Sequence, residues 1–216
     1  MSASTPQALA TLEFALVAAA AAIALFFRPW EVLRVPALRA PWLAALVLLP
    51  LLWAAQSLLP ADFPAALSGA CLLVLMFGWP LAILTLFAVA AAGAWLGGGD
   101  LARAVALAAW SGAVPATVAL ALGMATRRWL PRHLFVYILA RSFIGTALAT
   151  VLAALLRAWF GTGEAAAAAN AIFPAAWLIA WGEAFLTGAL TAIFVAFRPQ
   201  WLLTYSDARY LPPPLR

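Results

Sequence analysis

The residues of this chain that could do chemistry are charged side chains inside long apolar runs. Glu183 lies in the stretch WGEAFLTG, in the middle of one such run. Four further charges share this kind of setting: Glu13, Arg103, Arg141 and Arg157. If the runs cross a membrane, a central charge costs at least about 2.5–3.5 kcal/mol on insertion scales. Each of these residues is therefore predicted either to bind something or to have a partner.

The sequence leaves three interpretations of Glu183 open. The first is structural: a hydrogen-bonded or charge-paired glutamate that holds the runs 134–160 and 171–197 together. Arg141 is the possible partner on the neighbouring run, although the helical rise separates the two residues by about 10 Å in height. The second interpretation is a carboxylate that binds a cation or a proton. The third is a neutral or lipid-facing glutamate.

The other charges lie nearer the ends of their runs. Arg103 and Arg157 lie within about a turn of one membrane surface, where long arginine side chains reach water. Glu13 is near the same surface and could pair with either arginine. The three arginines, Arg141 included, are therefore charge-pair candidates, and the two glutamates are candidates for binding an ion or substrate.

No catalytic or metal-binding constellation accompanies these charges. His133 is the only histidine and lies in a basic loop, whereas a metalloprotease motif needs two histidines at helical spacing. Cys71 is the only cysteine, and no serine stands in a nucleophile elbow. We therefore expect a protein that is not an enzyme and that has no metal site and no cofactor.

Composition indicates the class of the protein. The chain has 216 residues, 68% of them hydrophobic and 9% charged, whereas soluble domains have about 25% charged residues. Apolar runs of about 18 residues or more predict transmembrane helices. The sequence therefore predicts an all-α membrane helix bundle, with residues 1–216 forming a single integral-membrane domain in a lipid bilayer. The net charge of +5 is weak evidence for nucleic acid, because basic residues in a membrane protein mainly set its topology.

Length and helix breakers divide the chain into seven predicted helices. The run 65–96 would make a helix about 48 Å long, which exceeds a hydrocarbon core of about 30 Å. The sequence GWP at 78–80 divides this run, because proline ends or kinks a helix. The predicted helices are 9–27, 42–59, 65–77, 80–96, 101–126, 134–160 and 171–197, followed by the tail 198–216.

The arginines predict the orientation. With seven crossings, the three arginine-rich segments 28–39, 127–132 and 198–216 all lie on one side. The positive-inside rule then places the N-terminus outside and the C-terminus in the cytoplasm. The piece 65–77 is short for a crossing, and short interrupted segments often line binding sites.

A family resemblance is carried by three stretches: LMFGWPLAILTL, LPRHLFVYILARSFIGTALA and EAFLTGALTAIFVAFRPQWLLTYSDARYL. They resemble the CbiM-type permeases, the substrate-capturing membrane subunits of energy-coupling factor transporters for cobalt and nickel, and more closely a proteobacterial branch of that family. The resemblance covers about residues 60–211. It implies a seven-helix fold with the N-terminus outside, and a transmembrane coupling subunit and ATPase subunits as partners.

The resemblance also implies a metal site, from which this chain departs. In the family the chain begins Met-His, and a second histidine comes from a HLLG stretch that opens the third helix. This chain begins Met1-Ser2, and the corresponding stretch, 66–69, reads Ala-Leu-Ser-Gly. Because imidazole is the natural ligand for nickel and cobalt, we expect a degenerate metal site and leave the substrate open. Ser68, and Glu183 as the match to a glutamate in the family's last helix, join Glu13 as substrate- or ion-binding candidates.

Two classes of function follow from these observations. A CbiM-like transport subunit needs a cavity that reaches the outer surface, lined by groups such as Ser68, Glu13 or Glu183. The alternative, a noncatalytic membrane scaffold, sensor or accessory partner, needs a packed bundle in which Glu183 is fully paired. The absence of lysine beside abundant alanine, glycine and arginine is typical of GC-rich bacterial genomes. We therefore expect a multi-pass protein of the bacterial inner membrane.

Overall fold

The computed structural model describes residues 6–56, 67–131, 133–160 and 169–210, and these residues are helical apart from short turns. Six helices are long and apolar enough to cross a membrane: Gln7–Phe26, Pro36–Ala55, Trp79–Leu96, Leu101–Trp129, Val136–Phe160 and Pro174–Phe197. The all-α prediction is confirmed for the described part of the chain.

The elements of the first half are α1 (Pro6–Phe26), the 3₁₀ turn η1 (Pro29–Arg34), α2 (Pro36–Gln56), α3 (Ala70–Phe77) and α4 (Trp79–Leu96). The second half has α5 (Leu101–Leu107), η2 (Ala108–Ala113), α6 (Val114–Trp129), η3 (Val136–Ile144), α7 (Gly145–Phe160), α9 (Ala169–Phe197), η4 (Pro199–Trp201) and α10 (Asp207–Tyr210). Both η2 and η3 are π-helical and continue directly into α6 and α7. The second helix begins at residue 36, earlier than the predicted 42, because α2 accommodates Pro41 and Pro50 in its interior, as membrane helices often do.

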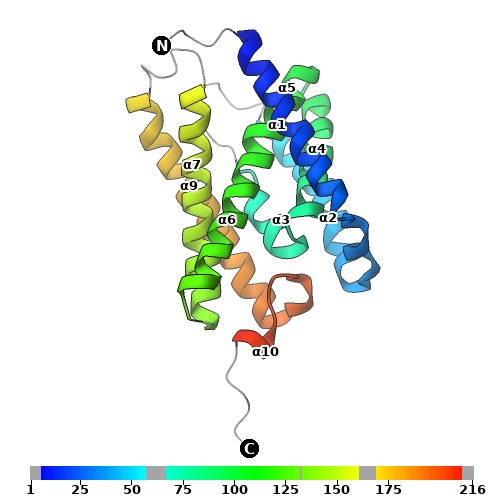
Figure 1. The fold of residues 1–216 in the computed structure, drawn as a ribbon, viewed down its shortest axis with the longest axis vertical. Coiled ribbons are helices and arrows are strands. Elements are labelled where there is room, and N and C mark those ends of the chain that lie inside the picture. Colours follow the sequence, from blue (N-terminus) through cyan, green and yellow to red (C-terminus); the bar gives the residue numbers. More distant parts are fainter. Residues whose placement is uncertain (1–5, 57–66, 132, 161–168, 211–216) are drawn as a thin grey trace, which may run out of the picture.

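The arginine-rich connections gather at one end of the bundle. Figure 1 shows α10, the α6–η3 connection and, toward the same end, η1, whereas the start of α1 and α5 lie at the opposite end. We call the end at which α10, the α6–η3 connection and η1 lie the arginine end. This arrangement is the one that the positive-inside prediction requires.

One element, α3, is too short to cross a membrane by itself. Its eight residues make about 12 Å of helix, against a hydrocarbon core of about 30 Å. Residues 67–69 before it are not helical, so the predicted helix 65–77 is corrected to a half-helix, and residues 65 and 66 lie outside the described residues. The local cause is Gly69, whose φ of 70° is a left-handed conformation that glycine adopts without a steric penalty.

The chain then reverses, and α4 runs back along α3. It turns at Gly78, whose φ of 75° and ψ of 163° lie in a region that is essentially restricted to glycine. Near the far end of α4, a Cβ added to Gly93 would lie 3.0 Å from the Trp53 Cβ on α2. The Trp53 indole N–H in turn donates to the Ser68 carbonyl at 3.2 Å. α4 therefore returns to the level at which α3 begins.

Candidate functional site

Glu183 lies on α9 with only 1% of its surface exposed, and its carboxylate accepts hydrogen bonds from three donors on other segments. Its Oε1 accepts from the Ser68 hydroxyl at 2.8 Å and from the Gly69 backbone N–H at 3.0 Å. Its Oε2 accepts from the Thr150 hydroxyl of α7 at 3.4 Å. Two of the predicted site residues, Ser68 and Glu183, therefore meet although 115 positions separate them.

This carboxylate caps the beginning of α3. The first N–H groups of a helix have no partner within it, and no water is available to them in the interior of a membrane. Gly69 precedes the helix and has no side chain that could serve as a cap. Glu183 accepts the Gly69 N–H, and the Ser68 hydroxyl accepts the Ala70 N–H at 3.0 Å. A negative group at this position also complements the positive end of the helix dipole.

The other end of α3 is capped by the segment that follows α9. The Leu203 N–H donates to the Met76 carbonyl at 3.0 Å, and the Thr204 N–H donates to the Leu75 carbonyl at 3.3 Å. The Thr204 hydroxyl adds a bond of 2.8 Å to the same Leu75 carbonyl. The last carbonyls of a helix lack partners within it, so α9 and its tail supply hydrogen-bond partners at both ends of α3.

Three tyrosines hold this tail against η3. The Tyr137 hydroxyl and the Thr204 hydroxyl lie 2.8 Å apart, and the ring centroids of Tyr137, Tyr205 and Tyr210 are separated by 5.0–5.5 Å. Burial, followed by the hydrogen bond and negative charge of Asp207, raises the pKa of Tyr205 to about 12. Tyr205 is therefore neutral at ordinary pH and packs against the other two rings without a charge of its own.

Glu13, Arg103 and Arg157 do not form the predicted charge pairs. Glu13 accepts the Trp110 indole N–H at 2.7 Å, which joins α1 to η2. Arg103 and Arg157 are exposed, and within the described residues neither is paired with Glu13. The pairing is replaced by a hydrogen bond to tryptophan, which partners the buried carboxylate without burying a second charge.

Arg141 does not reach Glu183. Its guanidinium carbon lies 5.6 Å from the centre of the Tyr137 ring, one helical turn nearer the arginine end. Side chains on a helix tilt toward its N-terminus, and the N-terminus of η3 is at the arginine end. Thr150, which does reach Glu183, lies nine residues further along the same span, a rise of about 13 Å.

Sequence reasoning missed three partners of the buried carboxylates: the Gly69 amide, Thr150 and Trp110. A signal existed for each, because Gly69 follows directly on Ser68, Thr150 is a polar residue within a span, and Trp110 lies inside a span rather than at its boundary. An indole N–H inside a membrane needs an acceptor. The pairing of each with one particular glutamate required the three-dimensional structure.

The chemistry that this site can do is limited by its donors. The groups around Glu183 present N–H and O–H hydrogens to the carboxylate, whereas a bound cation requires further lone pairs. Within the described residues, no three His, Cys, Asp or Glu side chains come together as possible metal ligands. The observed arrangement therefore closes a broken helix.

Fold and site together define the class of the protein: an all-helical chain with six helices able to cross a membrane and a buried carboxylate that caps a half-helix. No protein-family model, curated protein or solved structure matches the chain. The likeness to CbiM-type permeases stays a hypothesis that rests on the sequence.

The cap generates a stability prediction. In Glu183→Ala the donors of Ser68, Gly69 and Thr150 lose their acceptor, and each unsatisfied buried group costs about 1–3 kcal/mol. Glu183→Gln keeps one acceptor oxygen, so its loss of unfolding free energy is smaller. The measurement is the unfolding free energy of the detergent-solubilised protein, followed by circular dichroism.

The matched control is Glu31→Ala, which removes a carboxylate that is exposed on η1. Its effect should stay within about 0.5 kcal/mol, as for most surface substitutions. If Glu183→Ala were as stable as this control, the carboxylate would not be what closes α3.

Proposed function

We propose that this protein is a noncatalytic membrane subunit of a transport-type assembly, with the architecture of a CbiM-like permease and no nickel or cobalt site of its own. It resides in a bacterial inner membrane with its N-terminus outside and its C-terminus in the cytoplasm. Its partners, a transmembrane coupling subunit and ATPase subunits, dock at the arginine end.

The observation that carries this proposal is the commitment of Glu183 to α3. The resemblance places a ligand-bearing stretch at residues 66–69, and the last two residues of this stretch, Ser68 and Gly69, donate hydrogen bonds to Glu183. A metal ion bound there would have to displace these donors and uncap α3. Because the same contacts join α3 and α7 to α9, binding a metal would compete with holding the bundle together.

A second candidate function is capture of a small solute at this same place. It is favoured by the start of α3, where residues 67–69 are not helical at a depth at which backbone needs partners. Broken helices of this kind often line transport sites. In the first candidate function Glu183 keeps its hydrogen bonds to Ser68 and Gly69, whereas in the second a solute displaces them.

For nickel and cobalt, the metals that the family transports, calorimetric titration distinguishes between the two candidate functions. The purified protein in detergent is titrated with nickel and with cobalt, beside Glu183→Gln and Ser68→Ala. We expect a flat titration for the folded wild type. Neither a hydroxyl nor a carboxylate that already accepts three hydrogen bonds replaces imidazole as a ligand for these ions. Saturable binding that either substitution weakens would overturn the proposal in favour of metal capture.

Cross-linking tests the partner. A photoreactive residue replaces Trp129, at the arginine end of α6, or Trp95, at the opposite end of α4, which have nearly equal exposed fractions of 77% and 78%. In native membranes we expect the label at 129 to join an ATPase or another membrane subunit, identified by mass spectrometry, and the label at 95 to give no such product. Products from 95 alone, or from neither position, would contradict docking at the arginine end.

A further inference from the structure

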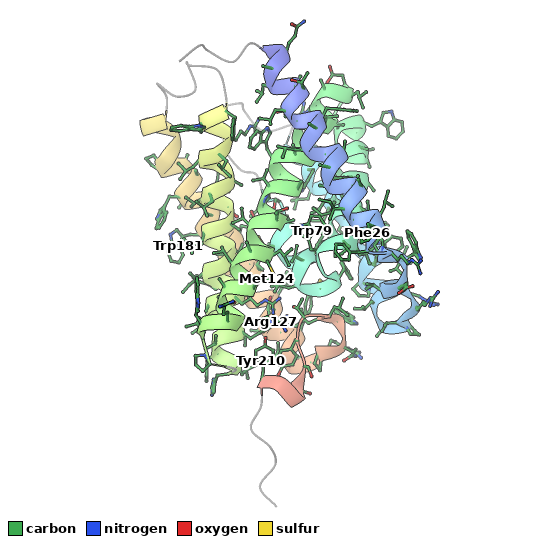
Figure 2. The ribbon with its side chains drawn as sticks, viewed as in Figure 1. Phe26, Trp79, Met124, Arg127, Trp181 and Tyr210 are labelled. Carbon is green, nitrogen blue, oxygen red and sulfur yellow. The ribbon has the colours of Figure 1, made fainter. Side chains whose placement is uncertain are left out.

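A basic cavity of about 420 Å³ lies at the arginine end, between α6, η3 and α10. Its polar lining consists of Thr126, Arg127, Arg128, Tyr137, Arg141 and Tyr210. Figure 2 places Met124, Arg127 and Tyr210, which all line it, in the same region of the bundle. Three guanidinium groups thus surround one cavity, and the described residues that line it include no aspartate or glutamate.

Arg141 is the innermost of the three arginines, and its charge is not fully partnered. Its Nη1 is buried and has no hydrogen-bond partner, whereas Arg127 and Arg128 are exposed. The backbone of α6 makes room for it: a Cβ added to Gly123 would lie 3.1 Å from the Arg141 Nε. A buried donor without an acceptor is costly, and more so for a charged group. The Arg141 guanidinium group therefore has a hydrogen-bond donor whose acceptor could be supplied by a ligand in the cavity.

We propose that this cavity binds a phosphate-bearing anion, with Arg141 holding it from inside and Arg127 and Arg128 from the rim. The planar guanidinium group matches phosphate oxygens in a bidentate manner. The Tyr210 hydroxyl is a further possible donor in the lining. The volume lies within the range of small-ligand sites, about 300–1,000 Å³, which favours a headgroup or a small solute over a peptide.

Two sources supply this chemistry: the headgroup of an anionic phospholipid and a free phosphate compound. Basic pockets between membrane helices on the cytoplasmic side recognise lipid headgroups, and the arginine end is where the charge rule places the cytoplasm. The lipid arm of the test uses mixed micelles of phosphatidylcholine with increasing phosphatidylglycerol. The solute arm uses inorganic phosphate against chloride at constant ionic strength. Both arms measure the unfolding midpoint, which rises when a ligand binds the folded state, and native mass spectrometry counts the bound lipids.

The matched variants are Arg141→Gln, Arg128→Gln and Arg103→Gln, each of which removes one positive charge. Arg103 is exposed on α5, at the opposite end of the bundle. We expect saturable stabilisation of the wild type in one arm, weakened about tenfold in Arg141→Gln, which equals about 1.4 kcal/mol. A smaller loss is expected in Arg128→Gln, and no change in Arg103→Gln. If Arg141→Gln does not fold, Arg128→Gln against Arg103→Gln carries the comparison.

The lipid arm and the solute arm together identify the source of the bound phosphate group. Saturation by phosphatidylglycerol alone identifies a lipid headgroup, and saturation by phosphate in the absence of that lipid identifies a free solute. No saturable effect in either arm, or an equal effect in the Arg128→Gln and Arg103→Gln variants, would overturn the proposal.

Discussion

The fold depends on one constraint: a helix that begins inside a membrane must find partners for its free backbone groups within the protein. In the interior of a membrane the first N–H groups of α3 have no water to bind, and its last carbonyls lack partners within the helix. Glu183 supplies the acceptor at one end, and the backbone of Leu203 and Thr204 supplies donors at the other. A carboxylate inside a membrane is by itself unfavourable in free energy. Here it also supplies the acceptor that the start of α3 would otherwise lack.

This constraint makes the last helix and its tail the organising segment of the bundle. Beyond the two caps of α3, α9 bonds η3, because the Ser142 hydroxyl donates to Thr191 at 2.9 Å. The Tyr137 hydroxyl lies against Thr204 of the tail, so η3 is held at both the helix and the tail. α3 thus connects Glu183 to the tail at the arginine end.

The sequence predicted the helical class and the break around Gly78 from composition and breakers alone, because these depend on local properties. It also predicted both Ser68 and Glu183 as site residues, Ser68 through the family resemblance and Glu183 as a charge inside an apolar run. It could not predict that they bond each other, or that Glu13 takes Trp110 as its partner. Such pairings depend on which helices are neighbours and at what height, and the apolar pattern of a membrane helix carries little of that information. The piece 65–77 was predicted to be short for a crossing, but its helical start at Ala70 was not predicted, because that boundary is set by a distant carboxylate.

The most direct test of this account is a double-mutant cycle between Ser68→Ala and Glu183→Ala. The unfolding free energies of the wild type, the two single variants and the double variant are measured in one detergent. Residues that share a hydrogen bond show coupling energies of about 0.5–3 kcal/mol, and we predict a coupling in this range. Additivity within about 0.3 kcal/mol would show that the two side chains act independently, and would contradict the cap on α3 as the interaction that holds the bundle.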